Sequence, residues 1–258
     1  MRLCRLILCG LLLLPHGVAA SDRLRELDYA SHLQGAISIG RAIWLMSDGQ
    51  GFLGLLTEAE KADNSNAAIV LHDFGQHPDQ QPLIHGMRTV LPLHNWTTLA
   101  IQLPLREIGA AAYDYYGLFD EARGRIRAAV AFLRNNGAQN IALIGIGTGA
   151  EMAAYTLSLD PDALFALVAI SLPLPNSTLP QAQVGDFIKA IALPFFDIYA
   201  EFDLPDVIDS ARQRRMLGKD NPVYRQLKIN GDNHGYEHDP DRLVKRVYSW
   251  LALNLNPN

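Results

Sequence analysis

A glycine-rich turn between two apolar segments places the strongest constraint on the fold. The residues Ile141–Ile144 form a short apolar run typical of a buried strand, and a helix is predicted from Ala150 to Leu159. Only Gly145–Gly149, with the sequence Gly-Ile-Gly-Thr-Gly, separates the two. Because the chain must reverse direction in so few residues, it needs the conformational freedom of glycine. A strand, a tight turn and an immediate helix are typical of folds in which helices connect parallel strands.

Strand and helix patterns alternate along the rest of the chain. Strands are predicted at 36–46, 52–57, 67–71, 96–103, 141–144, 164–171, 195–200 and 224–229. Helices are predicted at 23–29, 83–93, 119–135, 150–159, 181–192, 207–217 and 241–253. The first two strands flank the turn Ser47–Gly51 and form a hairpin. We therefore predict an α/β fold: a mostly parallel sheet of about eight strands with helices on both faces and an antiparallel edge. Residues 171–188 leave room for a loop and one helix, so no large lid is expected.

The first twenty residues have the pattern of a secretory signal peptide. Arg2 and Arg5 form a basic start, Leu6–Leu14 is an apolar run too short to span a bilayer, and Val18–Ala20 fits a cleavage site. Cleavage leaves residues 21–258 as a single domain. A retained membrane anchor is the alternative interpretation of this segment.

The composition indicates in which compartment the protein acts and which classes of partner it disfavours. The chain has two cysteines, Cys4 and Cys9, and both leave with the signal peptide, so the mature protein has neither a disulfide nor a thiol nucleophile. An exported protein without cysteine suits a bacterial periplasm. The net charge of −5 becomes −7 when Arg2 and Arg5 are removed. This balance disfavours nucleic acid and anionic membranes, and we expect a small-molecule ligand or a protein as the partner in the periplasm.

Polar side chains follow several predicted strands at the point where each strand ends. Because the carboxyl ends of parallel strands meet at one edge of a sheet, these side chains should lie close together. The residues concerned are His72, Asp73, Gly147, Thr148, Ser171, Glu201, Asp203, Asp232 and His234. The sequence therefore predicts a ligand site at this edge.

The order of these residues matches the α/β-hydrolase order of nucleophile, acid and histidine. In that fold the nucleophile lies on a strand-to-helix turn written G-x-S-x-G, so Gly145 and Gly149 are the framing glycines and Gly147 occupies the nucleophile position. Asp203 then holds the acid position, His234 the base position, and Thr148 the residue whose backbone N–H contributes to the oxyanion hole. Glycine has no side chain to attack a substrate, so the nucleophile is absent.

Four segments together carry a resemblance to a known family. They are His-Asp-Phe-Gly-Gln-His-Pro-Asp at 72–79, Trp-Thr-Thr-Leu-Ala-Ile-Gln-Leu-Pro at 96–104, Ile-Gly-Ile-Gly-Thr-Gly-Ala at 144–150 and Leu-Pro-Phe-Phe-Asp-Ile-Tyr at 193–199. In combination the chain, from about Leu33 to its C-terminus, resembles a family of exported proteobacterial α/β-hydrolase-like proteins of unknown function. The resemblance implies a hydrolase-type fold and a periplasmic address, and it supplies no activity.

Other assignments of the same residues stay open at this point. Thr148 or Ser171 is a candidate substitute nucleophile, although Thr148 also fits a helix cap and Ser171 a strand-end hydroxyl bonded to backbone. Asp206 competes with Asp203 as the acid. His72, Asp73 and Gly75 lie where this fold places its second oxyanion donor, and they also fit a plain turn at the end of a strand.

Two cofactor alternatives are weaker. A zinc site would need convergence of several side chains that lack the spacing of a known metal motif: His72, Asp73, His77, Asp232, His234 and His238. The residues Gly145, Gly147 and Ala150 also match a dinucleotide fingerprint, but the motif follows a middle strand and no acidic residue ends the next one. We therefore expect neither a metal nor a cofactor.

Two functions remain, and they belong to different classes. The absence of a nucleophile at Gly147 favours a non-catalytic pseudo-hydrolase that binds a ligand or acts as a scaffold. The retained Asp203 and His234 favour the alternative, a weak or unconventional ester or amide hydrolase in which this pair activates water or another hydroxyl.

Overall fold

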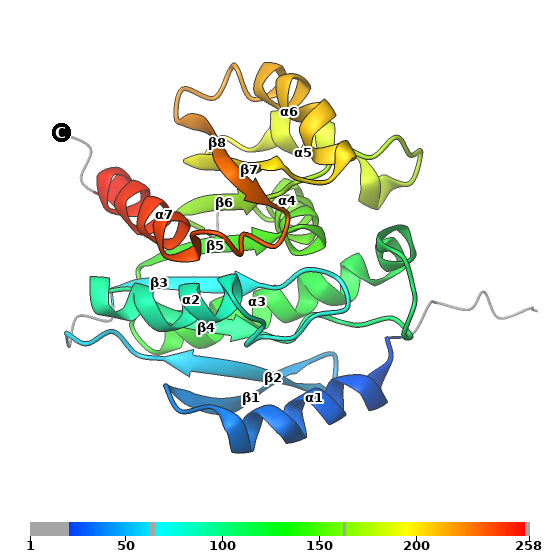
Figure 1. Cartoon of the computed structure of the whole chain (residues 1–258). Helices are drawn as coiled ribbons and strands as arrows, with labels where there is room; N and C mark the ends of the chain where they lie inside the picture. The colour runs from blue at the N-terminus through cyan, green and yellow to red at the C-terminus, as the bar shows by residue number, and fades with distance from the viewer. Residues whose placement is uncertain (1–20, 62–64, 162–163, 256–258) are drawn as a thin grey trace, which may run out of the picture.

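The computed structural model describes residues 21–61, 65–161 and 164–255, which form one open sheet between two layers of helices (Figure 1). The predicted signal peptide, residues 1–20, lies outside the described residues. Within those ranges, none of the helices combines the length and the apolar character that a membrane span requires.

The sheet has eight strands in the order β1-β2-β4-β3-β5-β6-β7-β8. Strand β2 runs antiparallel to its neighbours β1 and β4, and all other pairs are parallel. Their bounds are β1 Arg41–Ser47, β2 Gln50–Thr57, β3 Asn66–Leu71, β4 Thr97–Ile101, β5 Asn140–Ile146, β6 Ala166–Ile170, β7 Phe195–Phe202 and β8 Tyr224–Asn233. The predicted fold class, with its hairpin edge, is confirmed.

Alternation along each strand divides the core between the two faces of the sheet. In β3, Ala67, Ile69 and Leu71 point into one core, while Ala68 and Val70 point into the other, and all five are fully buried. Strands that are buried on both faces read as continuous apolar runs, which is why the parallel strands are easy to recognise in the sequence.

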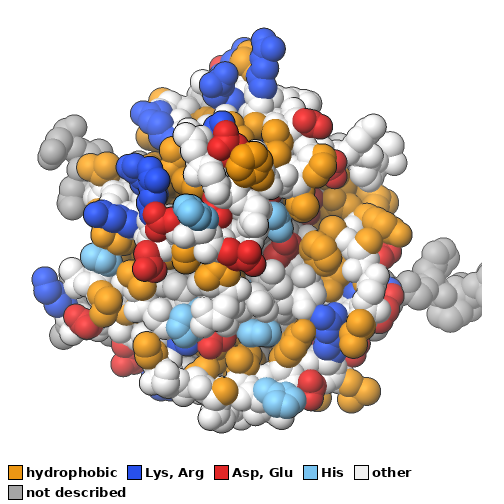
Figure 2. All heavy atoms as spheres, in the orientation of Figure 1, with side chains coloured by type: hydrophobic (Ala, Val, Ile, Leu, Met, Phe, Trp, Pro, Cys, Tyr) orange, Lys and Arg blue, Asp and Glu red, His pale blue; other side chains and the backbone are white. Residues whose placement is uncertain are grey.

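The helices divide between the two faces in the same way. One face is covered by α1 Arg23–Ala36, α2 Leu83–Val90 and α7 Pro240–Leu255, and the other by α3 Phe119–Asn135, α4 Thr148–Leu159 and α5 Val184–Ala190 (Figure 1). Helix α6, Pro205–Leu217, packs beside β7 and α5. Figure 2 shows the face that carries α2 and α7, where lysine and arginine side chains are dispersed in small groups among acidic ones.

Several boundaries differ from the prediction for local reasons. Helix α1 continues to Ala36, so β1 begins at Arg41 instead of residue 36. The helix predicted at 83–93 stops at Val90, and a 3₁₀ turn at Leu91–His94 follows, because Pro92 lacks the N–H that would continue an α-helix.

Further differences lie nearer the carboxyl edge of the sheet. The region predicted as a helix at 181–192 divides into a short 3₁₀ turn, Pro180–Ala182, and α5. Strand β8 extends to Asn233, which brings His234 to the end of the strand. A 3₁₀ segment at Ala112–Leu118 was not predicted.

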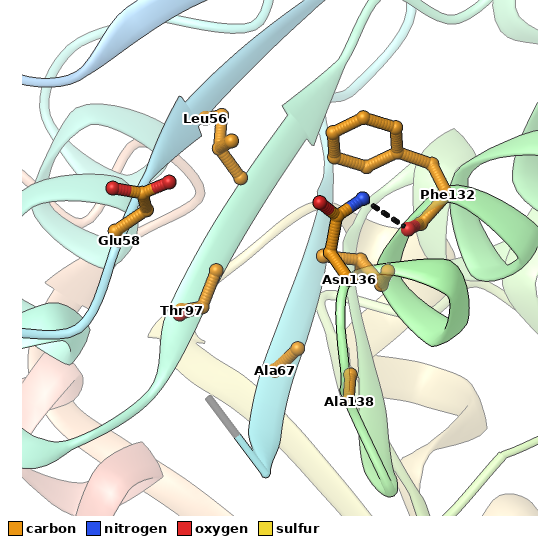
Figure 3. Close-up of a pocket in the computed structure, with 8 residues that line it drawn as sticks. Leu56, Glu58, Ala67, Thr97, Phe132, Asn136 and Ala138 are labelled. Carbon is orange, nitrogen blue, oxygen red and sulfur yellow. Dashed lines mark hydrogen bonds between the residues drawn. The ribbon is translucent and has the colours of Figure 1, made fainter. Parts of the chain in front are cut away.

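A small cavity of about 40 Å³ lies at the amino ends of the parallel strands (Figure 3). Its lining includes Ala67, the first buried residue of β3, and Thr97, the first residue of β4, with Asn136 bonded to the carbonyl of Phe132 beside them. Because so little space holds hardly more than water, and the predicted site residues lie at the opposite edge, we do not regard it as the functional site.

Candidate active site

Gly147 forms the sharp turn between β5 and α4. Its φ of 53° and ψ of −121° belong to a region that residues with a side chain rarely adopt. Its N–H donates to the carbonyl of Ile170 at 2.9 Å, which fixes the turn against the end of β6. A Cβ on Gly145 or Gly149 would collide with neighbouring backbone, so these two glycines are required sterically.

The carboxyl group of Asp73 fills the space directly above this turn. A Cβ built on Gly147 would overlap Cγ and both oxygens of Asp73. Asp73 Oδ1 accepts hydrogen bonds from the backbone N–H of Phe74 at 2.7 Å and of Thr148 at 2.8 Å. Two N–H groups that converge on one oxygen are the arrangement that stabilises a negative oxygen in acyl transfer. Here they hold an oxygen of the protein itself.

His234 joins Asp73 to Asp203. Nδ1 of His234 lies 2.7 Å from Asp203 Oδ1, and Nε2 lies 3.1 Å from Asp73 Oδ2. The predicted proximity of Asp203 and His234 is therefore observed. Asp206, the competing acid, is exposed in the first turn of α6, so Asp203 is the histidine's partner at Nδ1.

The two carboxyl groups decide the charge of His234. Burial lowers the pKa of this imidazole, but the hydrogen bonds and charges of Asp203 and Asp73 outweigh burial and raise its pKa to about 9. Burial raises the pKa of Asp203, yet bonds from His234, Ser171 and the backbone of Ala200 and Leu204 lower it overall. At neutral pH the site therefore holds an imidazolium between two carboxylates, and a protonated imidazole cannot act as a general base.

His72 fixes the backbone that carries Asp73. Its Nε2 accepts from the side-chain amide of Gln102 at 2.9 Å and from the N–H of Leu103 at 3.0 Å. Nδ1 therefore carries the proton and donates to the carbonyl of Asp73 at 2.7 Å. Burial lowers the pKa of His72 to about 3, so this histidine is a neutral cross-link between the ends of β3 and β4.

The substitute nucleophiles take other positions. The hydroxyl of Ser171 is fully buried, donates to Asp203 Oδ2 at 2.5 Å and lies 2.9 Å from the hydroxyl of Tyr236. The hydroxyl of Ser171 therefore helps to hold the carboxyl group of Asp203 in place. Thr148 is the first residue of α4 and Gly147 is its N-cap, so the predicted capping role of Thr148 was wrong.

Several residues of the zinc and dinucleotide alternatives make other contacts. Among the residues that the structure describes, no three histidine or acidic side chains converge as a metal site would require. His72 faces Gln102, and His77 packs against Tyr29. The N–H of Thr148, which a phosphate on this turn would need, is already bonded to Asp73.

A cavity of about 560 Å³ opens beside Asp73 and His234. Volumes of this size are typical of sites for small organic ligands. Its lining is largely apolar and aromatic and includes Phe74, Tyr113, Tyr116, Pro173, Leu179, Leu204 and Val207. A second cavity of about 180 Å³ also borders Asp73 and His234 and is lined by polar groups, among them Gln76, Gln80 and Glu237.

Glu151 is a second buried carboxyl group in the lining of the large cavity, which also includes the exposed Asp206. Glu151 is 1% exposed and accepts a hydrogen bond from the hydroxyl of Tyr116 at 2.9 Å. Burial raises its pKa, the Tyr116 bond lowers it, and the charge of Asp73 raises it further, to about 8 in all. This carboxyl group is therefore mostly protonated at neutral pH and can donate a proton or a hydrogen bond.

Sequence reasoning identified the pair of Asp203 and His234 but missed Glu151, Tyr116 and the position of the Asp73 side chain. Asp73 is the second residue after a predicted strand, so its place at the edge was expected, whereas its pairing with the turn at Gly147 depends on a loop conformation. Glu151 reads as an ordinary residue in the first turn of a helix, where acids are common. Its burial arises from the segment around Ala112–Leu118, whose packing no local pattern indicates.

The strand order, together with the polar residues at the carboxyl edge of the sheet, is that of an α/β-hydrolase fold. The chain belongs to the family described as protein of unknown function DUF3530, whose model matches residues 19–113 and 119–253. No protein of curated function matches the sequence.

Solved structures of several esterases and hydrolases share the fold. Est1E from Butyrivibrio proteoclasticus is 15% identical with a TM-score of 0.67, covering 83% of this chain and 98% of that one. The Pyrococcus furiosus esterase Pf2001 is 17% identical with a TM-score of 0.67, covering 82% and 89% respectively. Dienelactone hydrolase from Anabaena variabilis is 17% identical with a TM-score of 0.66, covering 82% and 95%. At these identities the likeness concerns the fold alone.

Proposed function

We propose that this protein is a pseudo-hydrolase toward acyl substrates: it binds a small, partly apolar ligand in the cavity beside Gly147 and does not cleave esters, thioesters or amides. Gly147 stands at the nucleophile position of the fold, and the carboxyl group of Asp73 takes the space of the missing side chain. The observation that carries the proposal is the occupation of both converging N–H groups, those of Phe74 and Thr148, by Asp73 Oδ1. A substrate carbonyl oxygen cannot use donors that are already engaged.

The chemistry of the cavity supports a ligand with an apolar body. Aromatic and aliphatic side chains form most of its wall, with Glu151 as a buried polar anchor. The proposal includes export: we expect the mature protein, residues 21–258, to act in the periplasm after cleavage of the signal peptide. This part rests on the N-terminal sequence. A periplasmic protein that docks on the same cleft is the other partner we expect.

A weak or unconventional ester or amide hydrolase is the second candidate, because the contact of 2.7 Å between His234 and Asp203 is intact. That mechanism requires Asp73 to leave the two N–H groups and His234 to lose its proton. With its pKa raised to about 9 by two carboxyl groups, His234 is a poor base at neutral pH. The geometry therefore favours binding over acyl cleavage.

The proposal predicts that the purified mature protein does not react with a fluorophosphonate probe and does not accelerate hydrolysis of p-nitrophenyl acetate or butyrate above the buffer rate. Fluorophosphonates require an activated hydroxyl, and none lies at this turn. An active serine esterase in the same buffer serves as the positive control. Labelling that maps to any residue of the cavity and disappears in His234→Ala would overturn the proposal in favour of the hydrolase.

A further inference from the structure

Hydrogen bonds to both oxygens fix the carboxyl group of Asp73 in one orientation. Oδ1 is fixed by two N–H groups, and Oδ2 is bonded through His234 Nε2 to the second carboxyl group, Asp203. Asp73 borders both cavities at this edge of the sheet although its side chain is almost wholly buried. An aspartate with a purely structural role at the end of a strand needs neither the contact with His234 nor a cavity on each side.

A carboxylate in this setting suits attack on a saturated carbon. A carboxylate can act as a nucleophile and form a covalent intermediate. An ester formed on a saturated carbon can then be cleaved by attack of water on its carbonyl carbon. If Oδ2 forms a bond to carbon, Oδ1 becomes the carbonyl oxygen of the ester. That oxygen already lies between the N–H groups of Phe74 and Thr148, which would stabilise the negative charge that develops when water attacks.

We propose that Asp73 is the nucleophile that opens an epoxide bound in the large cavity, with Glu151 as the proton donor to the epoxide oxygen and His234 as the base that hydrolyses the resulting ester. This goes beyond the proposed function, since an epoxide carbon is saturated and the acyl group that water later attacks belongs to Asp73 and not to a substrate. The class of substrate is an epoxide with an apolar substituent, which the aromatic wall would contact.

Glu151 is what points to an oxygen leaving group. It lines the cavity with its proton retained at neutral pH, and the bond from Tyr116 orients it. An epoxide oxygen becomes a basic alkoxide when the ring opens, and it needs such a proton.

The first step needs only Asp73, Glu151 and the epoxide. Asp73 Oδ2 donates an electron pair to an epoxide carbon, the bond between that carbon and the ring oxygen breaks, and the ring oxygen takes the proton of Glu151. The products are a hydroxyalkyl ester of Asp73 and a Glu151 carboxylate.

Ester formation also prepares His234 for the second step. The charge of Asp73 helps to raise the pKa of His234, so its loss lowers that pKa, and the imidazolium releases its proton to water while Glu151 takes one back from water. Neutral His234 then removes a proton from water, and hydroxide attacks Cγ of Asp73. When the tetrahedral intermediate collapses, the diol leaves with the proton from His234, and the Asp73 carboxylic acid that remains passes the second proton of the water to Nε2 of His234, which restores the carboxylate and the imidazolium. The polar cavity beside Gln76 and Glu237 offers a route for this water.

The test uses the mature protein, styrene oxide or 1,2-epoxyhexane, and water enriched in ¹⁸O. We expect diol formation by the wild type and one ¹⁸O atom on the peptide that contains Asp73, because water attacks Cγ. In His234→Gln the ester should accumulate and raise the intact mass by one equivalent of epoxide on Asp73. Asp73→Asn should abolish both signals, and Glu151→Gln should slow diol formation by about 100-fold or more.

The matched control is Asp186→Asn, an exposed acid on α5 that should behave as the wild type. Absence of diol, of ¹⁸O and of an adduct with both epoxides would overturn the inference, as would an adduct on another residue. If His234→Gln does not fold, the ¹⁸O result on the wild type decides alone. These readouts are independent of fluorophosphonate labelling, so failure of this inference and failure of the proposed function are distinguishable.

Discussion

A double variant, Asp73→Gly with Gly147→Ser, is expected to react with a fluorophosphonate probe that leaves the wild type unlabelled. The serine would lie on the turn at residue 147, in reach of the pair formed by His234 and Asp203. Removal of the Asp73 side chain frees the N–H groups of Phe74 and Thr148 for a negative oxygen. It also removes one of the two carboxyl groups that raise the pKa of His234, so the imidazole becomes a better base. Relative to the wild type, hydrolysis of p-nitrophenyl acetate should rise by about 100-fold or more.

The single variants are the controls for this gain of reactivity. Gly147→Ser alone should stay unlabelled, because its side chain would overlap the Asp73 carboxyl group, and Asp73→Gly alone has no nucleophile. His234→Ala in the double variant should remove the labelling. A folded double variant that does not react would contradict our assignment of Gly147 to the nucleophile position.

The second large effect concerns stability: Asp197→Ala is expected to lower the free energy of unfolding by about 3–5 kcal/mol. Asp197 on β7 and Arg214 on α6 form an ion pair of 2.9 Å in which both side chains are fully buried. Tyr224 and Gln226 on β8 donate to the same oxygen, at 2.7 and 2.9 Å. Alanine would leave the guanidinium buried without its counter-charge, which costs far more than the net contribution of an intact pair.

Urea unfolding followed by far-UV circular dichroism measures this loss. The matched control is Asp186→Ala, which breaks an exposed pair with Lys189 and should change stability by less than about 1 kcal/mol. A loss below about 1 kcal/mol in Asp197→Ala would show that the guanidinium finds water or another partner.

Most of the fold could be predicted because its parallel strands are buried on both faces. β3 and β5 are continuous apolar runs between turn residues, and such runs do not depend on distant contacts for their recognition. The boundaries that were wrong depend on local chemistry outside the pattern. Helix α1, for example, has weak apolar periodicity, and Ala30 and Leu33, which are buried in the core, lie beyond its predicted end.

The candidate site was predicted in part for a related reason. Strand ends fix where Asp203 and His234 lie, and chain order alone brings them to one edge. The sequence cannot show how the loop after β3 folds, and that loop carries Asp73 into the turn at Gly147. The burial of Glu151 likewise depends on the packing of the segment around Tyr116.

The most direct test of the account is an NMR titration of the His234 imidazole in the wild type and in Asp73→Asn. If the carboxyl groups of Asp73 and Asp203 both contact this ring, His234 should titrate near pH 9 in the wild type and at a clearly lower pH in the variant, which keeps the shape of the side chain without its charge. A His234 that titrates near the ordinary value in the wild type, or that does not respond to Asp73→Asn, would contradict the central claim that Asp73 occupies the active site.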